Sequence, residues 1–346
     1  MYSQCLAVLL LRCACLRRGL TFFLSCPDIT RQSLLNTFAL KYGSTGITFL
    51  QHSLPSFPRF HPMRRTCLQT LAMARFVRHH LSDQKEDLDK SITHFTEAIF
   101  LSYRSFDMPS LNLVQVFFRL ASALLRRAKQ FEQLEDATYS TNYLRHLRTL
   151  PLESFDILRD EVTTSLVRAL AIQVEFRVGD GIRDIQEMVV LCRELLTSDS
   201  SAGYPTNAII FLAGAVLDTF CSGDQVQPLD EVIECLQEAL KKCPPGLHQV
   251  SLALGGALTI RFVLFHSNDD YEEATTILDE VIDSYSKGDD RGPYYTYSMA
   301  LATLLAHARS VMYENPEYSE EAISRCRVFL NSSSLQTNSD LLSAKP

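Results

Sequence analysis

The stretch Leu120-Ala121-Ser122-Ala123 decides the fold, because variants of it recur along the chain at intervals of 49, 48, 44, 42 and 47 residues. The shared pattern is an apolar residue and a small residue, then any residue followed by another small one. Self-similarity at a period between 20 and 50 residues is the signature of a repeat architecture. The other copies are Leu71-Ala72-Met73-Ala74, Arg168-Ala169-Leu170-Ala171, Leu212-Ala213-Gly214-Ala215, Leu254-Gly255-Gly256-Ala257 and Leu301-Ala302-Thr303-Leu304.

A second column of apolar residues keeps a constant offset from the first. It lies 17 residues after the start of each copy, at Leu88, Ala137, Ile185, Leu229, Tyr271 and Tyr318. Apolar residues then follow at steps of 4, 7, 10 and 11, which is the stripe of an amphipathic helix. The clearest examples are Ile92, Phe95, Ala98 and Ile99 in the first unit, and Ile233, Leu236, Ala239 and Leu240 in the fourth.

Turn residues separate the predicted helices. Polar and acidic segments lie between the two helices of a unit, where Asp and Asn accept hydrogen bonds from the first free amides of the next helix. These segments are Ser82 to Asp87, Gly179 to Gly181, Gly223-Asp224 and Asn268 to Asp270. A proline separates consecutive units, because it lacks the amide donor and disfavours helix at the residue before it. The prolines are Pro109, Pro151, Pro205, Pro244-Pro245 and Pro293.

These patterns predict an all-α protein, an α-solenoid of about six antiparallel helix pairs over residues 67–330. Residues 1–66 do not follow the repeat and form an N-terminal segment of uncertain structure, which we expect to be dispensable for the repeat fold. Residues 331–346 are predicted to be a disordered tail. The last small residue of each copy should be buried at close helix contacts; these residues are Ala74, Ala123, Ala171, Ala215 and Ala257. The alternative is one irregular bundle with accidental periodicity.

The composition excludes several classes of protein. The 346 residues carry a net charge of −7 and 46% hydrophobic residues, and the basic residues form only doublets, which argues against nucleic acid as the main partner. No run of 18 apolar residues predicts a membrane span, and the first four residues lack the positive charge of a signal peptide. None of the ten cysteines forms a C-x-x-C motif, which indicates free thiols in a reducing compartment. We therefore expect a cytoplasmic protein without a membrane partner.

No residue pattern indicates a metal, a cofactor or catalysis. The spacing of Cys13 and Cys15 does not suit tetrahedral zinc, and His79, His80 and His94 include no H-x-x-x-H pair. Cys235 with His248 as a thiol nucleophile and base is less plausible than a buried structural thiol, because Cys235 falls beside an apolar stripe. We predict no enzyme, no cofactor and no metal site.

The repeats resemble tetratricopeptide-type (TPR-like) units, in the long, degenerate form found in fungal proteins. Glu86 to Ile99 and Pro228 to Leu240 fit the second half of such a unit, and Leu254 to Phe262 fits the first half. The resemblance covers roughly residues 67–330. In that family the array often lies beside a caspase-like CHAT peptidase or an immune-receptor NTPase module, and this chain contains neither. The resemblance thus implies a helical repeat and leaves any inherited protease activity in doubt.

The predicted function is a non-enzymatic scaffold that binds a protein or peptide of unknown identity. Arginines on the polar side of the first helices are candidates for binding acidic peptides or C-terminal carboxylates; they are Arg75, Arg78, Arg126, Arg168, Arg261 and Arg309. Among all the arginines, Arg78, Arg127 and Arg261 share one repeat position, seven residues after the start of a copy. The alternative is that these arginines pair with acids of the second helices.

Two further hypotheses remain open from the sequence. Acidic runs make the C-terminal half more negative, and they are either a solvated face or a site for a basic peptide. The second hypothesis, an alternative to the scaffold, is that the chain is a regulatory repeat fragment of a CHAT-peptidase or immune-receptor type protein, whose catalytic module is missing from it.

Overall fold

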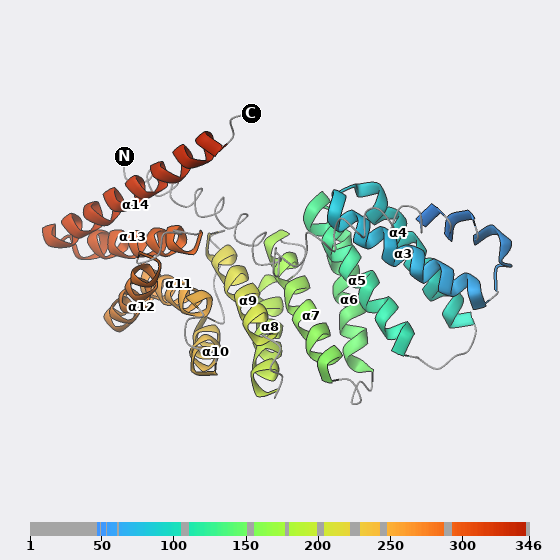
Figure 1. The fold of residues 1–346 in the computed structure, drawn as a ribbon. Coiled ribbons are helices and arrows are strands. Elements are labelled where there is room, and N and C mark those ends of the chain that lie inside the picture. The colour runs from blue at the N-terminus through green and yellow to red at the C-terminus, as the bar shows by residue number, and fades with distance from the viewer. Residues whose placement is uncertain are drawn as a thin grey trace. The chain divides into compact units, whose positions relative to one another are not determined.

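The computed structural model describes residues 47–48, 50–52, 54–60, 62–104, 111–150, 156–176, 180–198, 204–221, 229–242, 248–286 and 293–343. All regular structure in this part of the chain is helical, which confirms the predicted all-α class. The described residues divide into two compact units, one before and one after the boundary between Asp184 and Ile185. Each unit is a stack of helices in chain order (Figure 1).

In the unit that ends at Asp184, five long helices follow one another. They are α3 (Pro62–Ser82), α4 (Lys85–Arg104), α5 (Leu111–Phe131), α6 (Leu134–Thr149) and α7 (Asp156–Phe176). Each helix packs against the next, and α5 also touches both α3 and α7. The first helices of successive pairs therefore contact each other directly, as expected for a solenoid-like repeat.

The unit that begins at Ile185 has the same organisation. Its helices are α8 (Gly181–Thr197, whose first turn precedes the boundary), α9 (Tyr204–Cys221), α10 (Leu229–Lys242), α11 (His248–Phe265), α12 (Asn268–Ser286), α13 (Pro293–Tyr313) and α14 (Pro316–Ser343). From α9 onward each helix packs on the next, and α11 also touches α9 and α13. The helix α14 continues past the predicted end of the repeat at Leu330, through the stretch that the sequence predicts to be a tail.

The predicted second column forms the inner face of the second helices. Leu88, Ala137, Ile185, Leu229 and Tyr271 are buried, and Tyr318 is half-buried. The helical stripe of the first unit is buried at all four predicted positions. In the fourth unit Leu240 is exposed, although Ile233, Leu236 and Ala239 are buried. Burial of these apolar stripes supplies most of the stability of such helices.

In the repeated four-residue copies, the second residue is buried more consistently than the fourth, which the sequence predicted to be buried. Ala123, Ala215 and Ala257 are buried, but Ala74 and Ala171 are only half-buried. Ala171 shares the partly exposed face of α7 with Arg168 and Glu175, at helical spacing. The consistently buried small residues are the second of each copy, at Ala72, Ala121, Ala169, Ala213 and Ala302. In the fifth copy this place belongs to Gly255, where a methyl group would lie 2.9 Å from Leu278 Cδ2.

The turns within pairs share one backbone feature. Four first helices, α3, α5, α11 and α13, are each followed directly by a residue with positive φ. These residues are Asp83, Glu132, His266 and Glu314. A left-handed residue at this place closes the helix, and the amide of Asp83 accordingly donates to the carbonyl of His79 at 2.8 Å. Of the prolines that separate the units, Pro205 and Pro293 lie at the starts of α9 and α13, while Pro109, Pro151 and Pro244-Pro245 lie outside the described residues.

One helix is long and apolar enough to cross a membrane by length and composition alone. This helix is α11, with a mean hydropathy of 1.3 over 18 residues. It packs against α9, α10, α12 and α13, and 61% of it is buried in the protein. Its position at the centre of four other helices accounts for its composition.

Part of the N-terminal segment packs on the first helix pair. Ile47 is buried, and Leu54 in the short helix η1 (Leu54–Ser56) packs against Leu68, Ala98 and Leu101. Arg64 donates to the carbonyls of Leu54 and Phe57 at 3.2 and 3.4 Å. The described residues between 47 and 57 thus pack on the first helix pair, which argues against the expectation that all of residues 1–66 are dispensable. Residues 1–46 lie outside the described part.

Candidate interaction surface

The three arginines predicted to bind a peptide are each held by an aspartate nine residues later. Arg127 donates from Nε and Nη2 to the carboxylate of Asp136 at 2.6 and 3.0 Å. Arg261 makes the same two bonds to Asp270, at 2.9 and 2.6 Å. The turn between the two helices brings each pair together, and the planar guanidinium matches the two carboxylate oxygens.

The third nitrogen of these two arginines reaches the preceding helix pair. Arg127 Nη1 donates to Asp89 Oδ1 of α4 at 2.8 Å, and Arg261 Nη1 donates to Asp230 Oδ1 of α10, also at 2.8 Å. Each arginine therefore joins two acids from successive pairs. We refer to this three-residue arrangement as an arginine clasp: an arginine, the residue nine positions later, and an acid of the preceding pair.

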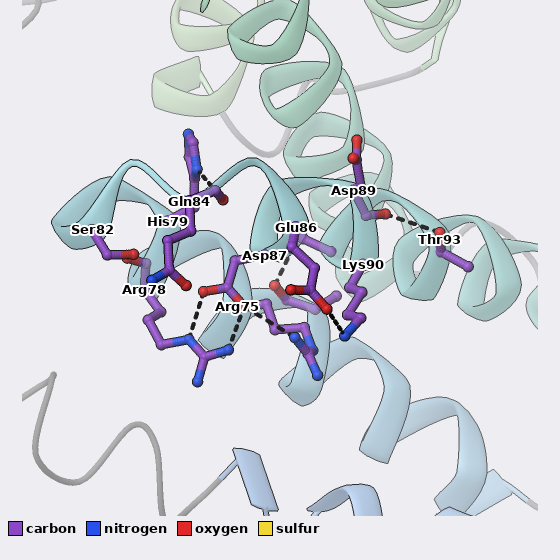
Figure 2. Close-up of polar contacts among 12 residues, drawn as sticks. Arg75, Arg78, His79, Ser82, Gln84, Glu86, Asp87, Asp89, Lys90 and Thr93 are labelled. Carbon is purple, nitrogen blue, oxygen red and sulfur yellow. Dashed lines mark hydrogen bonds and ion pairs between the residues drawn. The ribbon is translucent and has the colours of Figure 1, made fainter. Parts of the chain in front are cut away.

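The first pair contains the arginine and the aspartate of a clasp, and none of the described residues supplies the acid of a preceding pair (Figure 2). Arg78 Nε donates to Asp87 Oδ2 at 2.6 Å, and its Nη2 pairs with Oδ1 of the same carboxylate. Arg75, which is buried, also donates to Asp87 Oδ1, at 3.0 Å. Asp87 is buried as well, so two guanidinium groups neutralise one desolvated carboxylate.

The ion pairs shift the pKa of Asp87 and of the clasp arginines. Burial alone would raise the pKa of Asp87, but the hydrogen bonds and charges of Arg78 and Arg75 outweigh it and lower that pKa. The hydrogen bond to Asp136 and the further bond to Asp89 raise the pKa of Arg127, and Asp270 and Asp230 do the same for Arg261. These shifts favour the charged forms of Asp87, Arg127 and Arg261.

The sixth pair carries a modified clasp that shows a shift of register. Arg309 lies eight residues after the start of its copy, not seven, so this unit is displaced by one residue from the predicted alignment. Its residue nine positions later is Tyr318, whose hydroxyl accepts from Nη2 at 3.3 Å. The acid of the preceding pair is Glu272, at 3.7 Å. The guanidinium lies 4.0 Å from the ring centres of both Tyr271 and Tyr318, so cation–π contacts replace the missing aspartate.

Two units lack the clasp arginine. Its place is taken by Glu175 in α7 and by Thr219 in α9. The aspartate that follows Glu175 by nine residues, Asp184, pairs instead with Arg145 of α6 at 3.8 Å. The clasp is thus a feature of particular units and not of the whole array.

The other predicted arginines lie apart from the clasps. Arg126 donates to His79 Nε2 at 3.1 Å and pairs with Asp83 at 3.5 Å. Partial burial of the His80 ring lowers the pKa of His80 to about 4, together with the charges of Arg126, His79 and Arg168. Arg126 and Arg168 therefore lie near His80, where α3, α5 and α7 bring their polar sides together.

The sequence left two readings of the arginines, and internal ion pairing is the arrangement found at Arg78, Arg127 and Arg261. An acidic peptide would have to replace Asp87, Asp136 or Asp270, which are themselves buried and would be left without their partner. Peptide binding by these three arginines stays a prediction. Such binding would cost free energy, because a buried aspartate would lose its hydrogen-bond partner.

A second candidate surface, which the sequence did not single out, is apolar. It lies where α11 and α13 end, and its members are Leu264, Phe265, Val311 and Tyr313. Phe265 is 66% exposed and Val311 60%. His266 Nδ1 lies 3.0 Å from Met312 Sδ, which shows that the two helix ends are adjacent. We refer to these four residues as the apolar edge.

Acidic residues flank the apolar edge. Asp269 lies in the first turn of α12, Glu314 directly follows α13, and Glu317 lies in the first turn of α14; all three are exposed. Residues 185–346 contain 23 Asp and Glu against 10 Lys and Arg, so this unit as a whole is strongly negative. An exposed apolar group with one sign of charge around it is typical of a binding surface.

Three cysteines of the described residues are buried, as their apolar surroundings predict, while Cys326 is half-buried. Cys67, Cys192 and Cys235 are buried and form no disulfide. Cys192 and Cys235 are hydrogen-bonded to each other between α8 and α10, and burial raises the pKa of the Cys192 thiol. Across the described ranges, no three His, Cys, Asp or Glu side chains gather closely enough to hold a metal ion.

Comparison with known proteins adds no further assignment to these surfaces. The sequence matches no protein-family model. A comparison with curated proteins finds no match either.

Proposed function

We propose that this protein is a non-enzymatic scaffold that binds a basic, amphipathic protein segment on the apolar edge. The observation that carries the proposal is the exposure of Phe265 and Tyr313, at equivalent places in two successive pairs. The equivalent residue of the second pair, Phe131, is instead contacted by Lys85, whose Nζ lies 5.3 Å from the ring centre. An internal cation covers one member of this column, and a partner would cover the other two.

The chemistry of the partner follows from the flanking charges. Apolar side chains would bury the four residues of the apolar edge, and lysines or arginines beside them would face Asp269, Glu314 and Glu317. Burial of one large apolar side chain contributes about 1.5–3 kcal/mol. Long-range attraction by the acidic unit mainly raises the association rate. Both contributions require a partner with apolar anchors and positive flanks.

The test uses the full chain and two labelled helical peptides, one of leucine and lysine and one of leucine and glutamate with the same apolar face. Fluorescence anisotropy should show binding of the lysine peptide only, weakening as salt is added. The substitution Phe265→Ser should weaken that binding about tenfold or more. The matched control is Phe100→Ser, which removes an exposed phenylalanine of α4 in the compact unit that ends at Asp184.

Two results would contradict the proposal. Equal binding of both peptides would show that charge does not select the partner. Binding of the lysine peptide that Phe265→Ser and Phe100→Ser leave equally unchanged would place the site elsewhere.

A further inference from the structure

The last described second helix, α14, exposes a face whose counterparts in α4, α6 and α10 are buried. Ile323 of α14 is 50% exposed, although the residues at its place in α4, α6 and α10 are Ile92, Thr141 and Ile233, all buried. Cys326 is half-buried, where Phe95, Leu144, Leu236 and Leu278 are at most 1% exposed. The helices α4, α6, α10 and α12 each pack against the first helix of a following pair. Within the described part of the chain no further first helix covers this face of α14, which corresponds to the faces that α4, α6, α10 and α12 turn to the next pair.

The same face of α14 carries an acid of the kind that completes a clasp. Eleven residues after the clasp position, Asp89, Asp230 and Glu272 each pair with the arginine of the next helix pair. In the sixth unit this place belongs to Glu320, which is exposed and has no hydrogen bond or ion pair within the described chain. Glu320 therefore presents a carboxylate without the arginine that its counterparts have.

The first helix of the first pair, α3, has an arginine that lacks the complementary acid among the described residues. Arg78 uses Nε and Nη2 for Asp87, but none of the described residues supplies the acid that Nη1 has in the clasps of Arg127 and Arg261. Val77 beside it is 40% exposed, whereas Val174 and Ile260 at the same place are buried and Arg126 and Ala308 are half-buried. Ala74 is half-buried as well, and no preceding pair covers this part of α3 among the described residues.

We propose that two copies of this chain associate head to tail, with the α14 face of one copy covering the α3 face of the next. Glu320 would accept a hydrogen bond from Arg78 Nη1 of the second copy, and Ile323 would pack on Val77 and Ala74. The contact would repeat the interface that joins successive pairs within the chain. Because the two surfaces differ, the contact is heterologous, and it builds open chains unless the geometry closes a ring.

The experiment uses the full chain and compares two variants that each lose one surface. A tail variant carries Glu320→Lys and Ile323→Asp, and a head variant carries Val77→Asp, which leaves the buried pair of Arg78 and Asp87 in place. Circular dichroism melts establish that both variants fold. The control variant carries Glu280→Lys, which reverses an exposed acid of α12 away from the proposed contact.

Sedimentation velocity across a hundredfold dilution series gives the readout. The wild-type chain and the control should form species larger than a dimer as the concentration rises, and each surface variant alone should lose this association by about tenfold or more. An equimolar mixture of the two variants should form dimers and nothing larger, because only one intact head and one intact tail remain.

The proposal fails if the wild-type chain is monomeric at every concentration. It also fails if the tail variant associates as well as the wild-type chain, or if two folded variants form no dimer when mixed. Since neither surface includes the apolar edge, binding of the leucine–lysine peptide should be unchanged in all of these variants.

Discussion

Arg261 and Asp230 lie 31 residues apart in successive helix pairs, and their Nη1 and Oδ1 atoms are 2.8 Å from each other. The same arginine holds Asp270 of its own pair with two further bonds. One side chain thus closes a turn and joins two neighbouring pairs at once. An arginine clasp therefore contributes to the stability of a unit and to its coupling with the one before it.

The first prediction concerns removal of a clasp arginine. Arg127→Gln should lower the free energy of unfolding by about 2–3 kcal/mol, because Asp136 is left buried without its partner. Urea melts of the full chain measure this loss. The control is Arg183→Gln, at an exposed arginine of α8. If Arg78, Arg127 and Arg261 were replaced by Gln together and the melt stayed intact while an acidic peptide partner was lost, the peptide-binding hypothesis would be supported instead.

The second prediction concerns acid pH. The pKa of His80 is lowered to about 4 in the folded chain, below the ordinary value of 6.5. Between these values the unfolded chain binds a proton that the folded chain does not, so the contribution of His80 to stability is lost as pH falls from 6.5 towards 4. His80→Gln should make the pH dependence of unfolding shallower in this window. An NMR titration that placed the midpoint of the His80 ring near 6.5 would refute the expected shift.

The third prediction compares two adjacent glycines of α11. A methyl group at Gly255 would lie 2.9 Å from Leu278 Cδ2, whereas one at Gly256 would lie 3.4 Å from Leu301 Cδ1. Gly255→Ala should destabilise the chain by about 1 kcal/mol, because overpacking outweighs the gain in helix propensity. Gly256→Ala should stabilise it by about 0.5–1 kcal/mol. Thermal melts that gave the opposite order would show that Leu278 moves freely aside.

The fourth prediction concerns the left-handed residue at the end of α5. Glu132 has a φ of 55°, a conformation that disfavours residues with a side chain. Glu132→Gly should raise the free energy of unfolding by about 0.5–1 kcal/mol, since glycine suits this position best. Glu135→Gly, in the first turn of α6, provides the contrast and should lower stability. Equal effects of the two substitutions would contradict the role assigned to the backbone at Glu132.

The pairing of helices was predictable because buried positions are occupied by apolar residues that recur at a regular spacing in the sequence. Leu88, Ala137 and Leu229 lie where the constant offset places them, inside the stack. The slip of one residue in the sixth unit was not predictable from the small column, because Leu301 and Ala302 fit it in either register. The position of Arg309 relative to Tyr318 reveals the slip.

The candidate surfaces were predictable only in part. The nine-residue spacing of Arg78 and Asp87 recurs in two further units and could have identified the clasp, but acids near a helix start also serve as caps, and sequence does not separate the two roles. The apolar edge left no such record. Phe131 and Phe265 look alike in sequence, but Lys85 and His79 lie against the Phe131 ring while Phe265 is 66% exposed.

The nine-residue spacing of the clasp also sets where the chain tolerates changes of length. An insertion in the turn between Arg127 and Asp136 would move the carboxylate off the guanidinium, whereas an insertion between the end of α4 at Arg104 and the start of α5 at Leu111 would leave this turn unchanged. The interval between successive copies varies from 42 to 49 residues, while this spacing is the same in the first, second and fifth units. Added loops, tags or grafted epitopes should therefore be accommodated between helix pairs and rejected within them.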